Sequence, residues 1–218
     1  MIYKAFIPLL AFALAPVAYS RSAHNDSPIT RDILAACGAS IQPCQCPPGT
    51  SYAAVASYGF FLASVDDVSG IAASSFGDLA FLGLNVTNTT GKGFDLGSSR
   101  TFAVDWESAL DPIVIKEVLT TFELYDNEEG LRMTWEMGNA PFYYKRLNGE
   151  GGVLAGFWSF EELRQVGDHS FLMSSTWSCF GDSFSFRNLH QFMFDNIARI
   201  LKEQGKSDGT VIGLTHTG

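Results

Sequence analysis

Hydrophobic and polar residues alternate along residues 131–137, where every second side chain is apolar. The apolar positions are Leu131, Met133, Trp135 and Met137, and the polar positions between them are Arg132, Thr134 and Glu136. A period of two is typical of a strand with one buried and one solvated face. Residues 171–179 have the same period, and we expect their buried stripe to be Phe171, Met173, Ser175, Trp177 and Cys179.

Short polar segments separate these strands from their neighbours. Turn-forming residues occupy residues 126–130, 148–152 and 166–170, and strand-like stretches flank each of these segments. Strands that follow one another through short loops pair antiparallel. The middle of the chain therefore predicts an antiparallel sheet, and residues 51–64 predict an earlier strand.

The longest helical pattern covers residues 181–205. Its apolar face consists of Phe186, Leu189, His190, Met193, Ile197, Ile200 and Leu201. Asp182 or Ser183 can cap its start, Gly205 can end it, and a shorter helical pattern follows Ser64. The order of strand, helix, antiparallel strands and long C-terminal helix predicts an α+β fold.

The first twenty residues resemble a secretory signal. Lys4 precedes an apolar run over residues 5–15, and small residues stand at the expected cleavage site. A membrane helix is the alternative, but Pro8 and Pro16 interrupt a run that is shorter than the roughly 20 residues a span needs. We therefore predict a signal peptide at residues 1–20, no integral membrane span, and a secreted protein or one in the lumen of the secretory pathway.

Two sequons for N-glycosylation agree with this route. They begin at Asn85 and Asn88, in a polar segment rich in turn formers. We therefore expect a glycoprotein.

The four cysteines are Cys37, Cys44, Cys46 and Cys179. In an oxidising compartment they favour two disulfides, and the sequence leaves all three pairings open. Because three of them lie close together, we expect residues 21–50 to form an arm that is bridged to itself and fastened to the fold by Cys179. A zinc site is the alternative, but the chain has no Cys-x-x-Cys pair, so we predict no metal.

Composition indicates a single domain and excludes one class of partner. The chain has 218 residues, 46% of them hydrophobic, which is enough for one substantial core. We place this domain at residues 51–205 and expect a flexible tail at 206–218. A net charge of -9, from 14 basic and 23 acidic residues, gives no positive surface for phosphates, so we do not expect nucleic acid as a partner.

Large aromatic residues with a polar atom recur in the predicted strands. They are Trp135, Tyr143, Tyr144, Trp158 and Trp177. A buried Tyr or Trp needs a hydrogen-bond partner, so a wall of such residues on the inner side of the sheet suits a ligand pocket. A dense aromatic core without a pocket is the alternative.

Four short motifs and the order of elements resemble a known superfamily. The motifs are "GSSR" (97–100), "IKEVL" (115–119), "LRMTWEMGNAPF" (131–142) and "SSTWSCF" (174–180). With the long final helix, they are similar to the polyketide cyclase/dehydrase and lipid-transport branch of the START-like, or Bet v1-like (SRPBCC), superfamily, over roughly residues 52–204. The chain departs from that pattern where "AFLGLNV" replaces the usual Trp-x-Pro, and in its cysteine-rich arm.

The resemblance implies a helix-grip fold. In such a fold a seven-stranded antiparallel sheet wraps around the C-terminal helix and encloses an internal hydrophobic cavity. Arg100 and Glu117 would then lie on neighbouring strands, either as a mutual ion pair or as groups that orient a polar part of a ligand. The ligand-binding residues expected on this basis are Arg100, Glu117, Met133, Trp135, Tyr143, Trp158, Trp177, Phe186 and Met193.

Candidate acid–base groups are few. His190 on the inner helix face and Tyr144 at a strand end are the predicted catalytic residues, although a lone histidine there is also typical of a hydrogen-bonded core residue. Glu161 and Glu136 are possible carboxylates, and the alternation turns Glu136 outward. No nucleotide loop, catalytic triad or metal motif stands out, so we expect no cofactor.

Three functions follow from these observations. The first is a cyclase or pericyclase that folds a polyketide- or terpenoid-like molecule in its cavity, as in secondary-metabolite biosynthesis, with hydrogen bonds that lower the barrier. The second is a non-catalytic carrier of lipids or other apolar small molecules. The third is a secreted structural or interaction protein with a filled core and no cavity.

Overall fold

The computed structural model describes residues 46–125, 129–182 and 186–217. The strands in these ranges are β1 (Ser51–Phe61), β2 (Val86–Thr90), β3 (Ser99–Val104), β4 (Ile113–Leu124), β5 (Gly130–Met137), β6 (Phe142–Lys145), β7 (Gly151–Val166), β8 (His169–Phe180) and β9 (Val211–Thr217). The helices are α2 (Val65–Ala72), α3 (Phe186–Glu203) and the 3₁₀ turn η1 (Ala80–Leu82). None of the helices in these ranges is long and apolar enough to cross a membrane.

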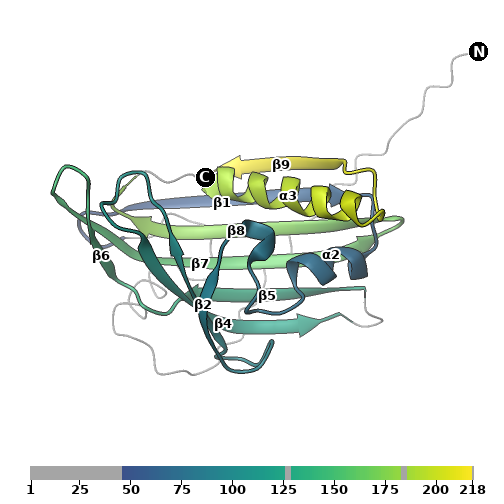
Figure 1. Ribbon diagram of the computed structural model, residues 1–218, viewed down its shortest axis with the longest axis horizontal. Helices are drawn as coiled ribbons and strands as arrows, with labels where there is room; N and C mark the ends of the chain where they lie inside the picture. Colours follow the sequence, from purple (N-terminus) through teal and green to yellow (C-terminus); the bar gives the residue numbers. More distant parts are fainter. Residues whose placement is uncertain (1–45, 126–128, 183–185, 218) are drawn as a thin grey trace, which may run out of the picture.

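The strands form one antiparallel sheet in the order β2-β3-β4-β5-β7-β8-β1-β9, with β6 paired to β7. Both helices lie on the same side of this sheet (Figure 1), with α3 against β1 and α2 against β7 and β8. We call this side the helix face and the opposite side the outer face. A sheet curved around its C-terminal helix is the helix-grip arrangement that the resemblance implied.

The sheet has nine strands in the described ranges, where the resemblance implied seven. One extra strand is the short β6, and another is β9, which lies within the segment expected to be a flexible tail. Gly205 and Gly209, with φ of 69° and 87°, turn the chain back after α3. β9 then pairs with β1, whose edge would otherwise leave backbone groups unpaired.

Side chains fill the space between α3 and the helix face. Six residues of α3 are at most 4% exposed: His190, Met193, Phe194, Ile197, Ala198 and Leu201. The Phe194 ring meets the Phe61 ring of β1 edge-on, with centroids 6.1 Å apart. The cavity expected beneath this helix is therefore not found in the described part of the chain.

The buried stripe of β8 is the reverse of the predicted one. Leu172, Ser174, Thr176 and Phe180 face the helix, and the stripe with Phe171 and Trp177 lies on the outer face. Both stripes of this strand mix large and small residues, so the period of two does not choose between them. The small hydroxyl side chains face inward because α3 approaches closely there, as the 3.1 Å contact between Thr176 and His190 shows.

A disulfide joins Cys46 to Cys179 of β8, with the two Cα atoms 5.4 Å apart. This confirms that Cys179 fastens the N-terminal segment to the body of the fold. Cys37 and Cys44 lie outside the described residues.

Candidate functional site

An ion pair is buried on the helix face. Arg100 of β3 stands opposite Glu117 of β4, and its Nε donates to Glu117 Oε2 at 2.5 Å. The arginine is 5% exposed and the glutamate 6%. Arg100 also donates to the backbone carbonyl of Phe76 at 2.9 Å. The predicted mutual pair is thus confirmed.

Two aromatic rings flank the guanidinium of Arg100. Its central carbon lies 4.3 Å from the centroid of the Phe76 ring and 5.2 Å from that of Trp135. The two rings also contact each other, with centroids 6.4 Å apart. Stacking and the ion pair together hold the planar cation in one orientation.

A second carboxyl group lies near this pair. Glu161 of β7 is 5% exposed and stands across from Met133 of β5 and Ser174 of β8. Burial raises the pKa of Glu161 to about 7; the negative charge of Glu117 also raises it, and Arg100 and a hydrogen bond with Ser174 lower it. Near neutral pH the group therefore exists in both its acid and its base form, as proton transfer requires.

Both ring nitrogens of His190 have a hydrogen-bond partner. Its Nδ1 lies 3.0 Å from the Ser57 hydroxyl, and its Nε2 lies 3.1 Å from the Thr176 hydroxyl. These hydroxyls extend to Thr215 and Ser159 at 3.1 and 3.2 Å. Burial lowers the pKa of His190 to about 4, so the ring is neutral at physiological pH. This geometry favours the interpretation of His190 as a hydrogen-bonded core residue.

Tyr144 belongs to a different network at the β6 end of the sheet. Its hydroxyl donates to Asp182, which also accepts from Arg146 Nε at 2.7 Å and from Ser108 at 3.1 Å. Burial, followed by the carboxylate of Asp182, raises the pKa of Tyr144 above its ordinary value. The two predicted catalytic residues, Tyr144 and His190, share no hydrogen-bond partner and do not form one site.

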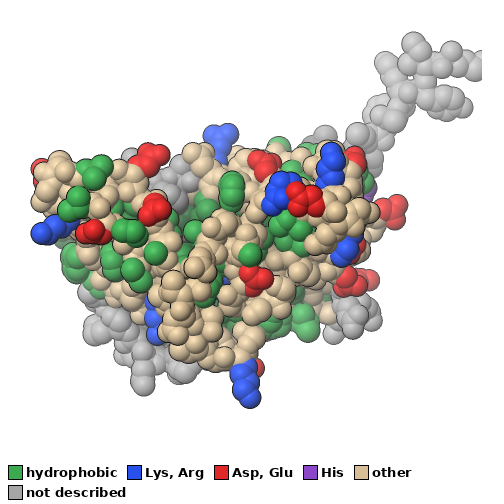
Figure 2. All heavy atoms as spheres, in the orientation of Figure 1, with side chains coloured by type: hydrophobic (Ala, Val, Ile, Leu, Met, Phe, Trp, Pro, Cys, Tyr) green, Lys and Arg blue, Asp and Glu red, His purple; other side chains and the backbone are tan. Residues whose placement is uncertain are grey.

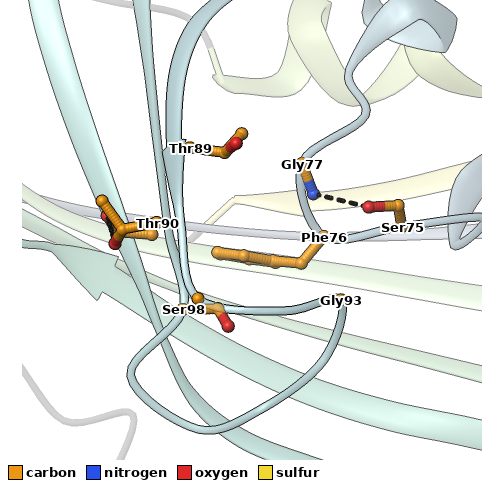
Figure 3. Close-up of a pocket in the computed structure, with 9 residues that line it drawn as sticks. Ser75, Phe76, Gly77, Thr89, Thr90, Gly93 and Ser98 are labelled. Atoms are coloured by element: carbon orange, nitrogen blue, oxygen red, sulfur yellow. Dashed lines mark hydrogen bonds between the residues drawn. The ribbon is translucent and has the colours of Figure 1, made fainter.

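A small polar pocket lies beside Phe76, the residue that stacks on Arg100. It has a volume of about 80 Å³ and is lined by Phe76 and by the hydroxyls of Ser75, Thr89, Thr90, Ser98 and Ser99, among others. Figure 3 shows the Phe76 ring pointing from the segment that carries Ser75 and Gly77 toward Thr90 of β2 and Ser98 just before β3. Phe76 therefore separates this pocket from the buried cation.

An open groove of about 500 Å³ lies at the β6 end of the molecule. It is lined by Leu110, Asp111, Pro112, Phe142, Tyr143, Tyr144 and Lys145. Tyr143 is 72% exposed, and Figure 2 shows hydrophobic side chains at the surface of this end among charged ones. Its lining suits an apolar molecule bound at the surface.

The remaining predicted ligand residues separate into three groups. Met133, Trp135 and Met193 lie in the packed core. Phe186 is partly buried at the start of α3, with its ring 6.3 Å from that of Phe157. Trp158 and Trp177 stand opposite each other on the outer face, so their prediction as inner-wall residues was wrong. The error has the same cause as the reversed stripe of β8, because neighbouring strands share a face at paired positions.

Glu161 was one of two carboxylates named from the sequence, but it was not among the predicted site residues. The signal was present in "WSFEELR", where two adjacent glutamates lie within a strand that alternates. One of the two must face inward, and the structure shows that Glu161 does while Glu162 pairs with Tyr125 and Arg164 on the outer side. Which of the pair faced inward depended on the register of β7.

No group of three or more metal-ligating side chains is found within the described ranges. Asn85 and Asn88 are exposed, the first just before β2 and the second within it. Both are open to a glycan, and their occupancy remains a prediction.

No family model and no curated protein matches the chain. Similar solved structures include norcoclaurine synthase from Thalictrum flavum in complex with dopamine and hydroxybenzaldehyde, at 16% identity and a TM-score of 0.45, covering 71% of this chain and 89% of that one. They also include Ara h 8.0201 (10% identity, TM-score 0.46, 70% and 99% covered) and major latex-like protein 151 from Panax ginseng (9%, 0.41, 70% and 97%). These three have the Bet v1-like fold. At such identities the likeness does not bear on ligand or reaction.

Proposed function

We propose that the protein is a cofactor-independent cyclase acting on a polyketide- or terpenoid-like small molecule, with Glu161 as its acid–base group. One observation carries this proposal. Glu161 is 5% exposed on the helix face, where it stands across from Met133 and Ser174. Its pKa is about 7, and the neighbouring cation is already bonded to Glu117. A buried acid that no ion pair neutralises lowers stability, and groups of this kind gather at active sites.

The chemistry required of Glu161 is a proton transfer in each direction. As a carboxylate it removes a proton from a carbon next to a carbonyl of the substrate. The resulting enolate carbon attacks a second carbonyl of the same molecule, and the carboxylic acid returns the proton to the new alkoxide. The ring of Trp135, which stays on the sheet, holds the substrate chain folded, and this removes much of the entropic barrier.

Substrate access in this proposal runs past Phe76. The pocket beside it, at about 80 Å³, is smaller than the roughly 300–1,000 Å³ of typical ligand sites. Binding therefore requires the segment between α2 and η1 to move away from Arg100, because Phe76 of this segment stacks on the cation and its backbone carbonyl accepts from it. Arg100 then orients a carbonyl oxygen while it stays bonded to Glu117.

The experiment compares two neighbouring glutamates in the organism that makes the protein. Glu161→Gln keeps the shape of the side chain and removes the acid, and Glu162→Gln is the matched control on the outer side of the same strand. We expect Glu161→Gln alone to abolish the cyclic product and to accumulate its uncyclised precursor. An unchanged product profile in the Glu161→Gln strain would refute the proposal that the protein is a cyclase with Glu161 as its acid–base group.

The alternative is a carrier of lipids or other apolar molecules, which the open groove at β6 favours. Mass spectrometry of small molecules bound to the purified protein separates the two functions. An unsaturated or polycyclic species that persists in Tyr143→Ala supports the cyclase. Mixed fatty acids that disappear in Tyr143→Ala and remain in Glu161→Gln support the carrier.

We also propose that the protein acts outside the cell or in the secretory lumen. The N-terminal sequence pattern and the Cys46–Cys179 disulfide support this location. N-terminal sequencing of the mature protein tests cleavage after about residue 20.

A further inference from the structure

The outer face of the sheet is apolar across neighbouring strands. Its aromatic residues include Tyr58 and Phe60 of β1, Trp158 of β7, and Phe171 and Trp177 of β8. The ring of Phe171 lies 5.9 Å from that of Tyr58 and 5.0 Å from that of Phe60, and Trp158 stands across from Trp177. This surface continues to Leu214 of β9, which is paired with Tyr58 and 62% exposed.

This apolar surface is not part of the core beneath α3. On β1, the residues that contact α3 include Ser57 and Phe61, which alternate with Tyr58 and Phe60. The solvated face of an antiparallel sheet is normally polar, and large apolar patches on a protein generally mark an interaction site. The outer face therefore has the composition of a surface that another segment or molecule covers.

The disulfide shows which part of the chain lies next to the apolar surface of the outer face. Cys179 lies on the outer face, two positions from Trp177, and its partner Cys46 packs beside Trp158 and Ala155. Residues 21–45 join the described structure at Cys46. The described chain thus begins at Cys46 on the apolar surface itself.

Two buried donors at the same place lack a hydrogen-bond partner. They are the Tyr52 hydroxyl and the Trp158 Nε1, and neither has one among the described residues. Tyr52 stands across from Cys179, and Trp158 packs against the disulfide. Buried tyrosine and tryptophan donors usually find an acceptor, and the backbone carbonyls of a covering segment would supply it.

We propose that residues 21–45 dock on the outer face and shield its aromatic residues from water. The segment carries Ile29, Ile33 and Leu34 for contact with the rings. An extended chain of this length reaches about 80 Å, whereas β1 with its 11 residues is about 36 Å long. The attached segment also outcompetes a second copy of the chain, because its effective concentration is of order millimolar.

Site-specific photo-crosslinking on the full mature chain tests the docking. A benzophenone amino acid replaces Tyr58 on the outer face in one variant and Leu214 in a second, and Tyr143 in the β6 groove provides the control. Equal amounts of isotopically light and heavy protein are mixed before irradiation, and the crosslinked peptides are identified by mass spectrometry.

We expect the Tyr58 and Leu214 probes to crosslink to peptides from residues 21–45 of the same isotopic label, and the Tyr143 probe not to do so. Crosslinks between light and heavy chains would mean that a second copy covers the face. The absence of crosslinks to this segment from both outer positions would mean that the face is open. Either of the last two results overturns the proposal.

Discussion

His190 and Glu161 are both buried on the helix face, but they differ in hydrogen bonding and in the protonation states that they populate near pH 7. Two hydroxyls, those of Ser57 and Thr176, bond both ring nitrogens of His190. Burial holds the pKa of the histidine at about 4, so it carries no charge that needs a partner. Glu161 is hydrogen-bonded to the Ser174 hydroxyl, and its pKa is about 7. Near neutral pH it is therefore present in both its neutral and its charged form.

The difference teaches that burial alone does not mark a functional group. A titratable residue whose polar atoms are satisfied in one protonation state stabilises the core and has little reason to exchange its proton. A residue held between two protonation states costs stability and is suited to proton transfer. By this criterion the Glu161 region is the candidate site, and the His190 region is part of the scaffold.

The largest expected effect comes from removing the cation beside Glu161. Arg100→Met leaves Glu117 buried without its partner, and breaking such a pair costs about 3–5 kcal/mol. Urea unfolding followed by tryptophan fluorescence measures the loss.

Arg132→Met provides the matched control. Arg132 pairs across strands with Glu123 at 2.8 Å, but these side chains are 34% and 55% exposed. We expect a loss below about 1 kcal/mol, as for surface pairs. Equal losses in the two variants would contradict the account of a buried pair.

The next effect concerns how stability depends on pH. Because the folded-state pKa of Glu161 is about 7 and its ordinary value is 4.5, the wild type loses stability as pH rises through this window, by about 3 kcal/mol. Glu161→Gln removes this loss, so we expect the variant to gain on the wild type between pH 4.5 and 8. If the unfolding free energies of the wild type and Glu161→Gln differed by a constant amount over that range, the raised pKa of Glu161 would be contradicted.

His190→Asn should show the opposite dependence. The contribution of His190 is complete above pH 6.5 and is lost as pH falls toward its folded pKa of about 4. The variant leaves the hydroxyls of Ser57 and Thr176 with poorer partners, at a cost of about 1–3 kcal/mol at pH 7. Denaturant unfolding at pH 7 and 5 tests this. In our account the product profile stays unchanged, and its loss would assign catalysis to His190.

Ser174→Ala is expected to have the smallest effect. The hydroxyl lowers the pKa of Glu161, so its removal raises that pKa further. The associated change in stability is about 1 kcal/mol or less at neutral pH. Ser175→Ala, at the next position on the outer face, is the control and should leave the titration of Glu161 where it is. A downward shift in Ser174→Ala would exclude the hydroxyl as a donor to the carboxylate.

Local patterns in the sequence predicted several elements well. The alternation at 131–137 corresponds to β5, and the final helical pattern corresponds to α3. Ser64 caps α2 as expected, with its hydroxyl accepting from the backbone N–H of Asp67 at 3.2 Å. These features depend on interactions between residues near one another in the chain, which a single sequence records directly.

Features that depend on distant strands were predicted poorly. The inward face of β8, the outward position of Trp158 and the pairing of β9 are each decided by register between strands. Arg100 and Glu117 were found because both are charged residues inside strand patterns. Glu161 was named beside Glu136 as a carboxylate but was not placed among the site residues, because two adjacent glutamates occupy this strand and only the three-dimensional register shows which one faces inward.

Titration of the Glu161 carboxyl group by ¹³C NMR, assigned with the Glu161→Gln variant, shows directly whether this group can act as the acid–base group. We expect a pKa of about 7 for this group. A value near the ordinary 4.5 would show that the carboxyl group is solvated or ion-paired, and would contradict its role as the acid–base group.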